Sequence, residues 1–142
     1  MNVKSFWERL NHTYDSLGVD FGDVSLLSNS RMSLEASEYA RDAGRFDSFH
    51  DRVFRAYFTE TRDIGDLDVL LALAREEGLD ADDLRVALQE GRYASRLDEA
   101  RSEGQQLGIN AVPTFIINGG HRIVGAQSLD FFKERLKEIQ GE

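Results

Sequence analysis

The chain has 142 residues, a length that suits one domain with a hydrophobic core of its own. It carries 17 Lys and Arg against 26 Asp and Glu, and its net charge of −9 argues against binding to nucleic acid or to an anionic membrane surface. It contains no cysteine, so disulfides, thiolate metal sites and cysteine nucleophiles are excluded within this sequence. No apolar run approaches the ~18 residues of a membrane span, and residues 1–10 resemble no signal peptide, so we expect a cytoplasmic protein.

Hydrophobic residues at helical spacing predict six helices in the first three quarters of the chain. They cover about residues 4–17, 30–43, 46–60, 67–77, 81–90 and 92–107, and a glycine follows five of them, at positions 18, 44, 78, 91 and 108. Asn29 or Ser30, Asp66 and Asp80 are suitable N-caps. Residues 19–27 fit a short strand or a loop equally well. In the sixth helix, Tyr93, Leu97, Ala100, Gly104 and Leu107 lie on one stripe.

The third predicted helix carries the densest aromatic stripe in the chain. Its apolar positions are Phe46, Phe49, Val53, Phe54, Tyr57 and Phe58. Such a stripe can line a ligand pocket, or it can pack against other helices in a core. Regular helical spacing is the usual sign of a core, so the core is the preferred interpretation.

The pattern changes in the last quarter of the chain. Residues 112–118 are β-branched and aromatic, as in a strand, and Asn118-Gly119-Gly120 is a strong hairpin signal before a returning strand over 121–124. Ser128 can cap a last helix that continues to Ile139. We therefore expect a mostly helical α/β fold in a single domain, residues 1–142, with a helical region over 1–108 and a ββα unit over 109–142.

Candidate catalytic and metal sites are few. The three histidines, His12, His50 and His121, have no metal-ligand spacing, and a position at the hairpin tip predicts that His121 is exposed. The acidic run over 60–83 lacks the alternating ligands of a calcium loop and is interpreted as helix caps on a solvated face. We expect no catalytic residue, no metal and no cofactor in this chain.

The remaining candidate is the sequence Ala111-Val-Pro-Thr-Phe115, which contains Pro113, the one proline of the chain. A cis Val112–Pro113 bond would turn the backbone of Val112 outward, toward an extended ligand. Because the cis form of an X–Pro bond costs only ~0.5–1 kcal/mol, it is feasible here. A trans proline at the start of a strand is the alternative.

At these residues the sequence resembles the DsbA-like proteins of the thioredoxin superfamily, and among them the FrnE type. The resemblance is carried by Gly108–Gly119, by Val124-Gly-Ala-Gln127 and by the helical segments Asn29–Ala36, Gly44–His50 and Phe54–Phe58. It implies a partial thioredoxin-like fold in which a DsbA-type helical insertion precedes the β-hairpin and the last helix. It also implies that Val112 and Pro113 bind a peptide or protein substrate.

The sequence departs from this family in one respect that affects function. Family members use a Cys-x-x-Cys pair at the start of a helix, whose thiolate attacks a disulfide, and this chain has neither that βαβ unit nor a cysteine. The resemblance therefore suggests a truncated or degenerate form of a dithiol–disulfide oxidoreductase that is inactive in exchange. A non-catalytic module that binds peptides or partners, or that dimerises, is the alternative.

The resemblance also predicts an open sheet edge. In the thioredoxin arrangement the proline strand lies between a first strand, absent here, and the second strand of the hairpin. An uncovered edge over residues 112–118 would leave backbone N–H and C=O groups free to pair with another chain. We therefore expect a homodimer, with pairing of residues 19–27 onto the same edge as the monomeric alternative.

Overall fold

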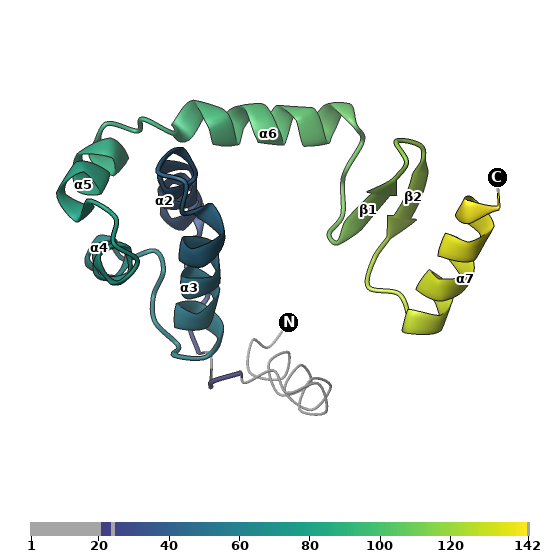
Figure 1. The fold of residues 1–142 in the computed structure, drawn as a ribbon, viewed down its shortest axis with the longest axis horizontal. Coiled ribbons are helices and arrows are strands. Elements are labelled where there is room, and N and C mark those ends of the chain that lie inside the picture. The colour runs from purple at the N-terminus through teal and green to yellow at the C-terminus, as the bar shows by residue number, and fades with distance from the viewer. Residues whose placement is uncertain (1–20, 24, 142) are drawn as a thin grey trace. The chain divides into compact units, whose positions relative to one another are not determined.

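The computed structural model of the chain describes residues 21–23 and 25–141 (Figure 1). It forms two compact units, Met1–Asp98 and Glu99–Glu142. The helix predicted over residues 4–17 lies outside the described residues, as does His12. The single domain and its expected division at residue 108 stay predictions. None of the helices in the described part of the chain is long and apolar enough to cross a membrane.

Four helices of the first unit pack around one hydrophobic core (Figure 1). They are α2 (Arg31–Asp42), α3 (Phe46–Phe58), α4 (Leu67–Glu76) and α5 (Ala81–Gln89). Helix α2 contacts the other three, and α4 contacts both α3 and α5. The largest side chains that are fully buried are Phe49, Leu70, Leu71, Leu73 and Leu84. Each stabilises the fold by about 1.5–3 kcal/mol through removal of apolar surface from water.

Polar capping side chains and a glycine define the ends of these helices, mostly as predicted. The Asp66 carboxylate accepts hydrogen bonds from two backbone N–H groups at the start of α4, and Asp80 does the same for α5. Ser30 is the N-cap residue of α2, but its side chain makes no capping bond; the Asn29 side chain accepts from Arg31 N instead, at 3.0 Å. Gly44 ends α2 with a φ of 69°, a conformation that costs glycine little.

The segment before α2 is a loop, so the undecided prediction for residues 19–27 resolves against a strand in its described part. Phe21 packs edge-on against Phe58 with ring centroids 5.7 Å apart, and Gly22 N donates to the Phe58 carbonyl at 2.7 Å. A Cβ atom on Gly22 would lie 2.3 Å from the Thr59 carbonyl oxygen. Only glycine can therefore approach the end of α3 this closely.

Helix α6 (Ala94–Gln106) lies within the predicted range of 92–107. No residue of the predicted stripe is buried within α6, and Leu107 beyond its end is exposed. Tyr93, which precedes the helix, is the buried member of that stripe. Its ring packs edge-on against Tyr39 with centroids 6.1 Å apart. The chain therefore enters α6 through an anchored tyrosine and then leaves the core of the first unit.

The second unit contains a β-hairpin and a last helix, as predicted. Strands β1 (Thr114–Ile117) and β2 (His121–Val124) are antiparallel, with Thr114 opposite Val124 and Ile117 opposite His121. The first strand is shorter than the predicted 112–118. Asn118 and Gly119 have φ values of 50° and 73°, which the turn requires. Helix α7 (Leu129–Gln140) begins at Ser128, whose side chain accepts from Phe131 N at 3.2 Å.

Candidate functional site

The candidate site is the loop between α6 and β1, which contains Val112 and Pro113. The Val112–Pro113 peptide bond is cis, which was one of the two alternatives that the sequence left open. The side chain of Val112 is 89% exposed, the highest value among the large hydrophobic residues that the structure describes as exposed. An apolar side chain in this position is accessible to a partner.

Contacts with β2 hold both ends of this loop. At its start, the Arg122 guanidinium donates to the carbonyl of Gly108 at 3.1 Å and also to that of Leu107. At its end, Gly125 N donates to the Pro113 carbonyl at 2.8 Å. Within the loop, the Thr114 hydroxyl donates to the Ala111 carbonyl at 2.7 Å. Arg122 thus binds the carbonyls of the two residues that follow α6.

The hydrogen bond from Gly125 to Pro113 also fixes which backbone groups of β1 point outward. Along an antiparallel strand, alternate residues direct their N–H and C=O groups to opposite edges. Because Pro113 faces β2, the backbone groups of Thr114 and Ile116 face away from it. The described part of the chain contains a two-stranded sheet with no third strand on this edge.

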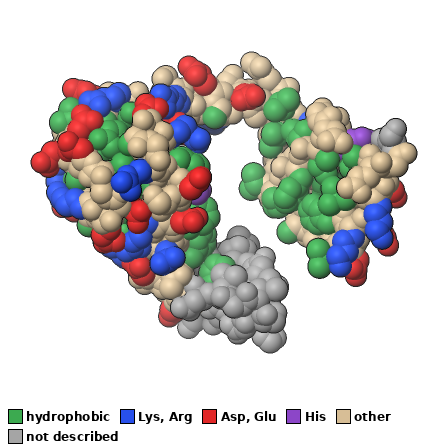
Figure 2. All heavy atoms as spheres, in the orientation of Figure 1, with side chains coloured by type: hydrophobic (Ala, Val, Ile, Leu, Met, Phe, Trp, Pro, Cys, Tyr) green, Lys and Arg blue, Asp and Glu red, His purple; other side chains and the backbone are tan. Residues whose placement is uncertain are grey.

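Exposed apolar side chains are concentrated in the second unit (Figure 2). The second unit holds eight of the thirteen large hydrophobic residues that are exposed in the described chain, although it is less than a third of the sequence. They are Leu107, Val112, Phe115, Ile116, Val124, Leu129, Phe131 and Leu136. A concentration of this kind marks a contact surface more often than scattered single residues do.

The aromatic stripe of α3 serves both of the roles considered for it. Phe49 and Val53 are buried in the core, as the preferred interpretation requires. His50 and Phe54 line a largely apolar pocket of about 270 Å³ between α2 and α3. The His50 ring lies between those of Phe46 and Phe54, with centroid distances of 5.0 and 4.7 Å. The lining of the pocket also includes the hydroxyl groups of Ser33, Ser37 and Tyr57.

The other sequence candidates remain apart from one another. His121 is the first residue of β2, where the returning strand was predicted to begin, but it is half-buried, so its predicted exposure was wrong. No group of three or more His, Asp or Glu side chains in the described ranges is arranged to hold a metal ion. The acidic residues of 60–83 include the two helix caps, Asp66 and Asp80, as expected.

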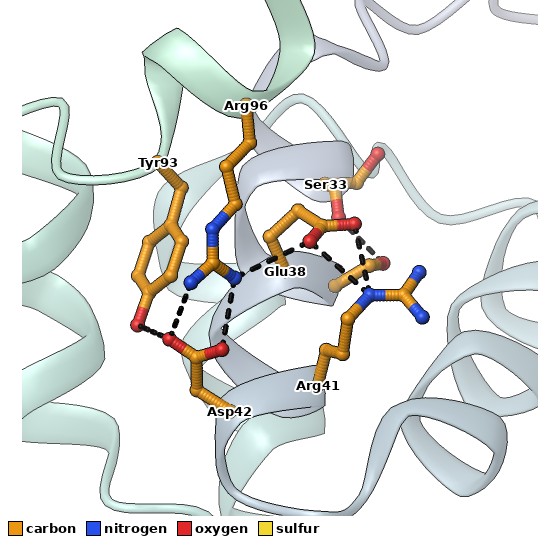
Figure 3. Close-up of polar contacts among 7 residues, drawn as sticks. Ser33, Glu38, Arg41, Asp42, Tyr93 and Arg96 are labelled. Carbon is orange, nitrogen blue, oxygen red and sulfur yellow. Dashed lines mark hydrogen bonds and ion pairs between the residues drawn. The ribbon is translucent and has the colours of Figure 1, made fainter. Parts of the chain in front are cut away.

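A polar cluster in the first unit was not predicted (Figure 3). Arg96 donates to both carboxylate oxygens of Asp42, at 2.8 and 3.0 Å, and the Tyr93 hydroxyl donates to Asp42 at 3.1 Å. Arg96 also contacts Glu38 at 3.4 Å. The hydrogen bonds from Arg96 lower the pKa of the Asp42 carboxyl below its ordinary value. Burial and the bond to Asp42 raise the pKa of Tyr93. The cluster ties the start of α6 to α2.

Comparisons with known proteins agree on one family. The family model described as a DSBA-like thioredoxin domain matches residues 4–137. The uncharacterized protein YwbO of Bacillus subtilis strain 168 is 34% identical over 129 residues, which cover 89% of this chain and 64% of that protein. A solved structure from Streptomyces coelicolor, described as a probable DsbA oxidoreductase, superposes with a TM-score of 0.83 at 25% identity.

The solved structure is matched over 98% of this chain and 61% of its own length. The chain therefore spans less than two thirds of both proteins. The matches confirm the predicted resemblance and the predicted fold class, a mostly helical DsbA-like thioredoxin arrangement.

Proposed function

Because the chain belongs to the DSBA-like thioredoxin domain family, we propose that it holds an extended polypeptide for thiol–disulfide exchange. The polypeptide lies along the backbone of Val112, directly before the cis Pro113. The cysteines that react with it are not part of this chain, which contains none. The observation that carries the proposal is the exposure of Val112 directly before the cis Pro113, in a loop that Arg122 and Gly125 hold at both ends.

The physical basis is hydrogen bonding between two backbones. Backbone hydrogen bonds to Val112 supply affinity with little demand on the bound sequence, and exposed apolar side chains favour unfolded segments. A substrate held in this way presents its own disulfide to an attacking thiolate. The thiolate sulfur bonds to one sulfur of the substrate, the other leaves as a thiolate, and a mixed disulfide results. Binding of the polypeptide and its reaction with a thiolate are separate steps, and the described residues support the binding step.

Binding is tested with the unfolded, alkylated B chain of insulin, which has no free thiol. We expect amide signals of the loop and of β1 to shift in an NMR titration. Val112→Glu should weaken binding about tenfold, which corresponds to about 1.4 kcal/mol. Leu129→Glu is the matched control, because Leu129 is also an exposed apolar residue of the second unit, at 69%, and it lies outside the loop. Equal loss in both variants would refute a site at Val112.

Activity is tested by joining a βαβ unit with Cys-x-x-Cys to residue 1 and following insulin reduction. The chain alone should give the blank rate, because exchange requires a thiolate. The fusion should reduce insulin, and Val112→Glu in the fusion should raise KM more than it lowers kcat. If the chain binds the peptide but the fusion is inactive, the second candidate applies, a binding module without catalysis.

A further inference from the structure

The Thr114 hydroxyl donates a hydrogen bond to the Ala111 carbonyl at 2.7 Å, across the Val112 loop. Threonine side chains commonly bond to backbone groups a few residues away in the chain. Donor and acceptor both belong to residues 111–114, so the contact is made within this segment and does not depend on what covers the sheet. It determines the direction in which the Ala111 carbonyl points.

The direction of the Ala111 carbonyl in turn determines that of the Val112 N–H group. The two groups belong to the same peptide unit, which is trans. A trans peptide unit is planar, so its C=O and N–H bonds point in opposite directions. Because the carbonyl points toward the Thr114 hydroxyl, the Val112 N–H group points away from it. The hydroxyl therefore sets the direction of a donor on the most exposed apolar residue of the loop.

The Val112 N–H group is the one backbone donor between Ala111 and Thr114, because proline has no N–H group. A polypeptide that pairs with the backbone of Val112 can bond to this donor and to the Val112 carbonyl. The following carbonyl, that of Pro113, already accepts from Gly125 N at 2.8 Å. The direction of a single N–H group therefore decides whether the loop can bind a carbonyl of the polypeptide.

We propose that Thr114 is a positioning residue, whose hydroxyl holds the Val112 N–H group in the direction that a bound polypeptide requires. It acts through the peptide unit between Ala111 and Val112. The inference rests on the proposed function for the nature of the ligand, and it adds that the ligand offers a backbone carbonyl to Val112. A donor that is oriented before binding lowers the ordering cost that a mobile loop would incur.

The first test is made on the free protein. Thr114→Val replaces the hydroxyl by a methyl group and keeps a branched side chain, whereas Thr114→Ser keeps the hydroxyl. We expect an NMR order parameter of about 0.85 for the Val112 N–H bond in the parent and in the serine variant, and a fall toward ~0.6 in the valine variant. The carbonyl carbon signal of Ala111 should shift in the valine variant alone.

The second test is the affinity for the alkylated B chain of insulin. Thr114→Val should weaken binding about fivefold, because the loop loses one hydrogen bond between uncharged groups. Thr114→Ser should bind like the parent, and this rescue separates the hydroxyl from the packing of the side chain. Circular dichroism confirms that both variants are folded.

Two results would overturn the inference. The first is an equal order parameter of Val112 in the valine variant and the parent, because the hydroxyl would then not hold the peptide unit. The second is an order parameter that falls while the affinity stays the same, because the direction of the N–H group would then not matter for binding. If the parent binds no B chain but the valine variant alone loses order at Val112, the proposed function fails and the hold of Thr114 on the N–H group stands.

Discussion

Asp42 and Arg96 lie 54 positions apart and meet through two hydrogen bonds of 2.8 and 3.0 Å. Both guanidinium Nη atoms donate, one to each carboxylate oxygen, which is the strongest geometry of such pairs. The Arg96 guanidinium also lies 5.0 Å from the centroid of the Tyr93 ring. Since no residue of α6 is buried, these polar contacts have a large share in holding the start of that helix against α2.

Replacement of Asp42 by Asn should lower the thermal midpoint at pH 7 by a few degrees. The pKa of the Asp42 carboxyl is lower in the folded protein than in the unfolded chain, where it is ~3.9. The stability that the ionised carboxylate contributes is therefore present above pH ~3.9 and is lost as the pH falls through the pKa of the folded state. The difference between the variant and the parent should therefore shrink toward pH 3. Thermal unfolding across this range measures it. Glu99→Gln, an exposed change in the same helix, should leave the midpoint unchanged.

Tyr39 should make the fold sensitive to alkali. Burial raises the pKa of its hydroxyl to about 12, and the hydroxyl donates to the Asp80 carbonyl at 3.2 Å. The tyrosine hydroxyl has a pKa of ~10 in the unfolded chain, so the stability that depends on its neutral form is complete below pH ~10. This stability is lost as the pH rises to about 12, and the total loss is about 2–3 kcal/mol. Denaturant unfolding from pH 9 to 12 measures this loss.

Tyr39→Phe separates the hydroxyl from the ring. At pH 7 it should cost about 0.5–1.5 kcal/mol, because one hydrogen bond is lost and the ring stays packed. Above pH 10 its stability should fall less steeply than that of the parent. Identical slopes in the two proteins would show that another group causes the alkaline loss.

The aromatic stripe of α3 offers a direct comparison between core and pocket positions. Phe49→Ala should destabilise the first unit by about 3–5 kcal/mol, since its side chain is fully buried. Phe54→Ala should cost much less, because Phe54 is 50% exposed at the wall of the pocket. Urea unfolding of both variants gives the two values. Similar losses would mean that Phe54 is also part of the core.

The N-cap of α7 allows the stability of the second unit to be tested separately from that of the first. Ser128→Ala removes the side-chain acceptor for Phe131 N and should cost about 0.5–2 kcal/mol. Hydrogen exchange should accelerate at amides of α7 and leave those of α2–α5 unchanged. Asp80→Ala, at the start of α5, is the reciprocal control and should have its effect in the first unit. Acceleration in both units from either change would indicate that they unfold together.

Local signals were sufficient to predict most of the described elements. Asp66, Asp80 and Ser128 predicted helix starts, and Asn118 with Gly119 predicted the turn, because each acts on backbone groups within three residues of itself. The exposure of α6 could not be predicted from its stripe. Helical spacing shows that a helix has an apolar stripe, but it does not show that another element lies against it.

The candidate site was predicted in part. The proline loop was visible in the sequence because Pro113 stands alone in a segment of β-branched residues. Its contacts were not visible, since the pairing of Gly125 with Pro113 depends on the register of the hairpin. The bonds from Arg122 to residues before the loop depend on how the end of α6 returns to β2. Contacts of this kind follow from tertiary structure and leave no local pattern.

The Val112 loop is held at both ends, and this affects the free energy with which it binds a ligand. Arg122 and Gly125 belong to the same short segment of chain, and they hold Gly108 and Pro113 respectively. Much of the conformational entropy of the residues between them is therefore lost on folding, before any ligand arrives. A ligand then meets a surface already ordered for contact and loses less free energy to ordering it. A substitution at Arg122 would release the loop and weaken binding without removing a single contact to the ligand.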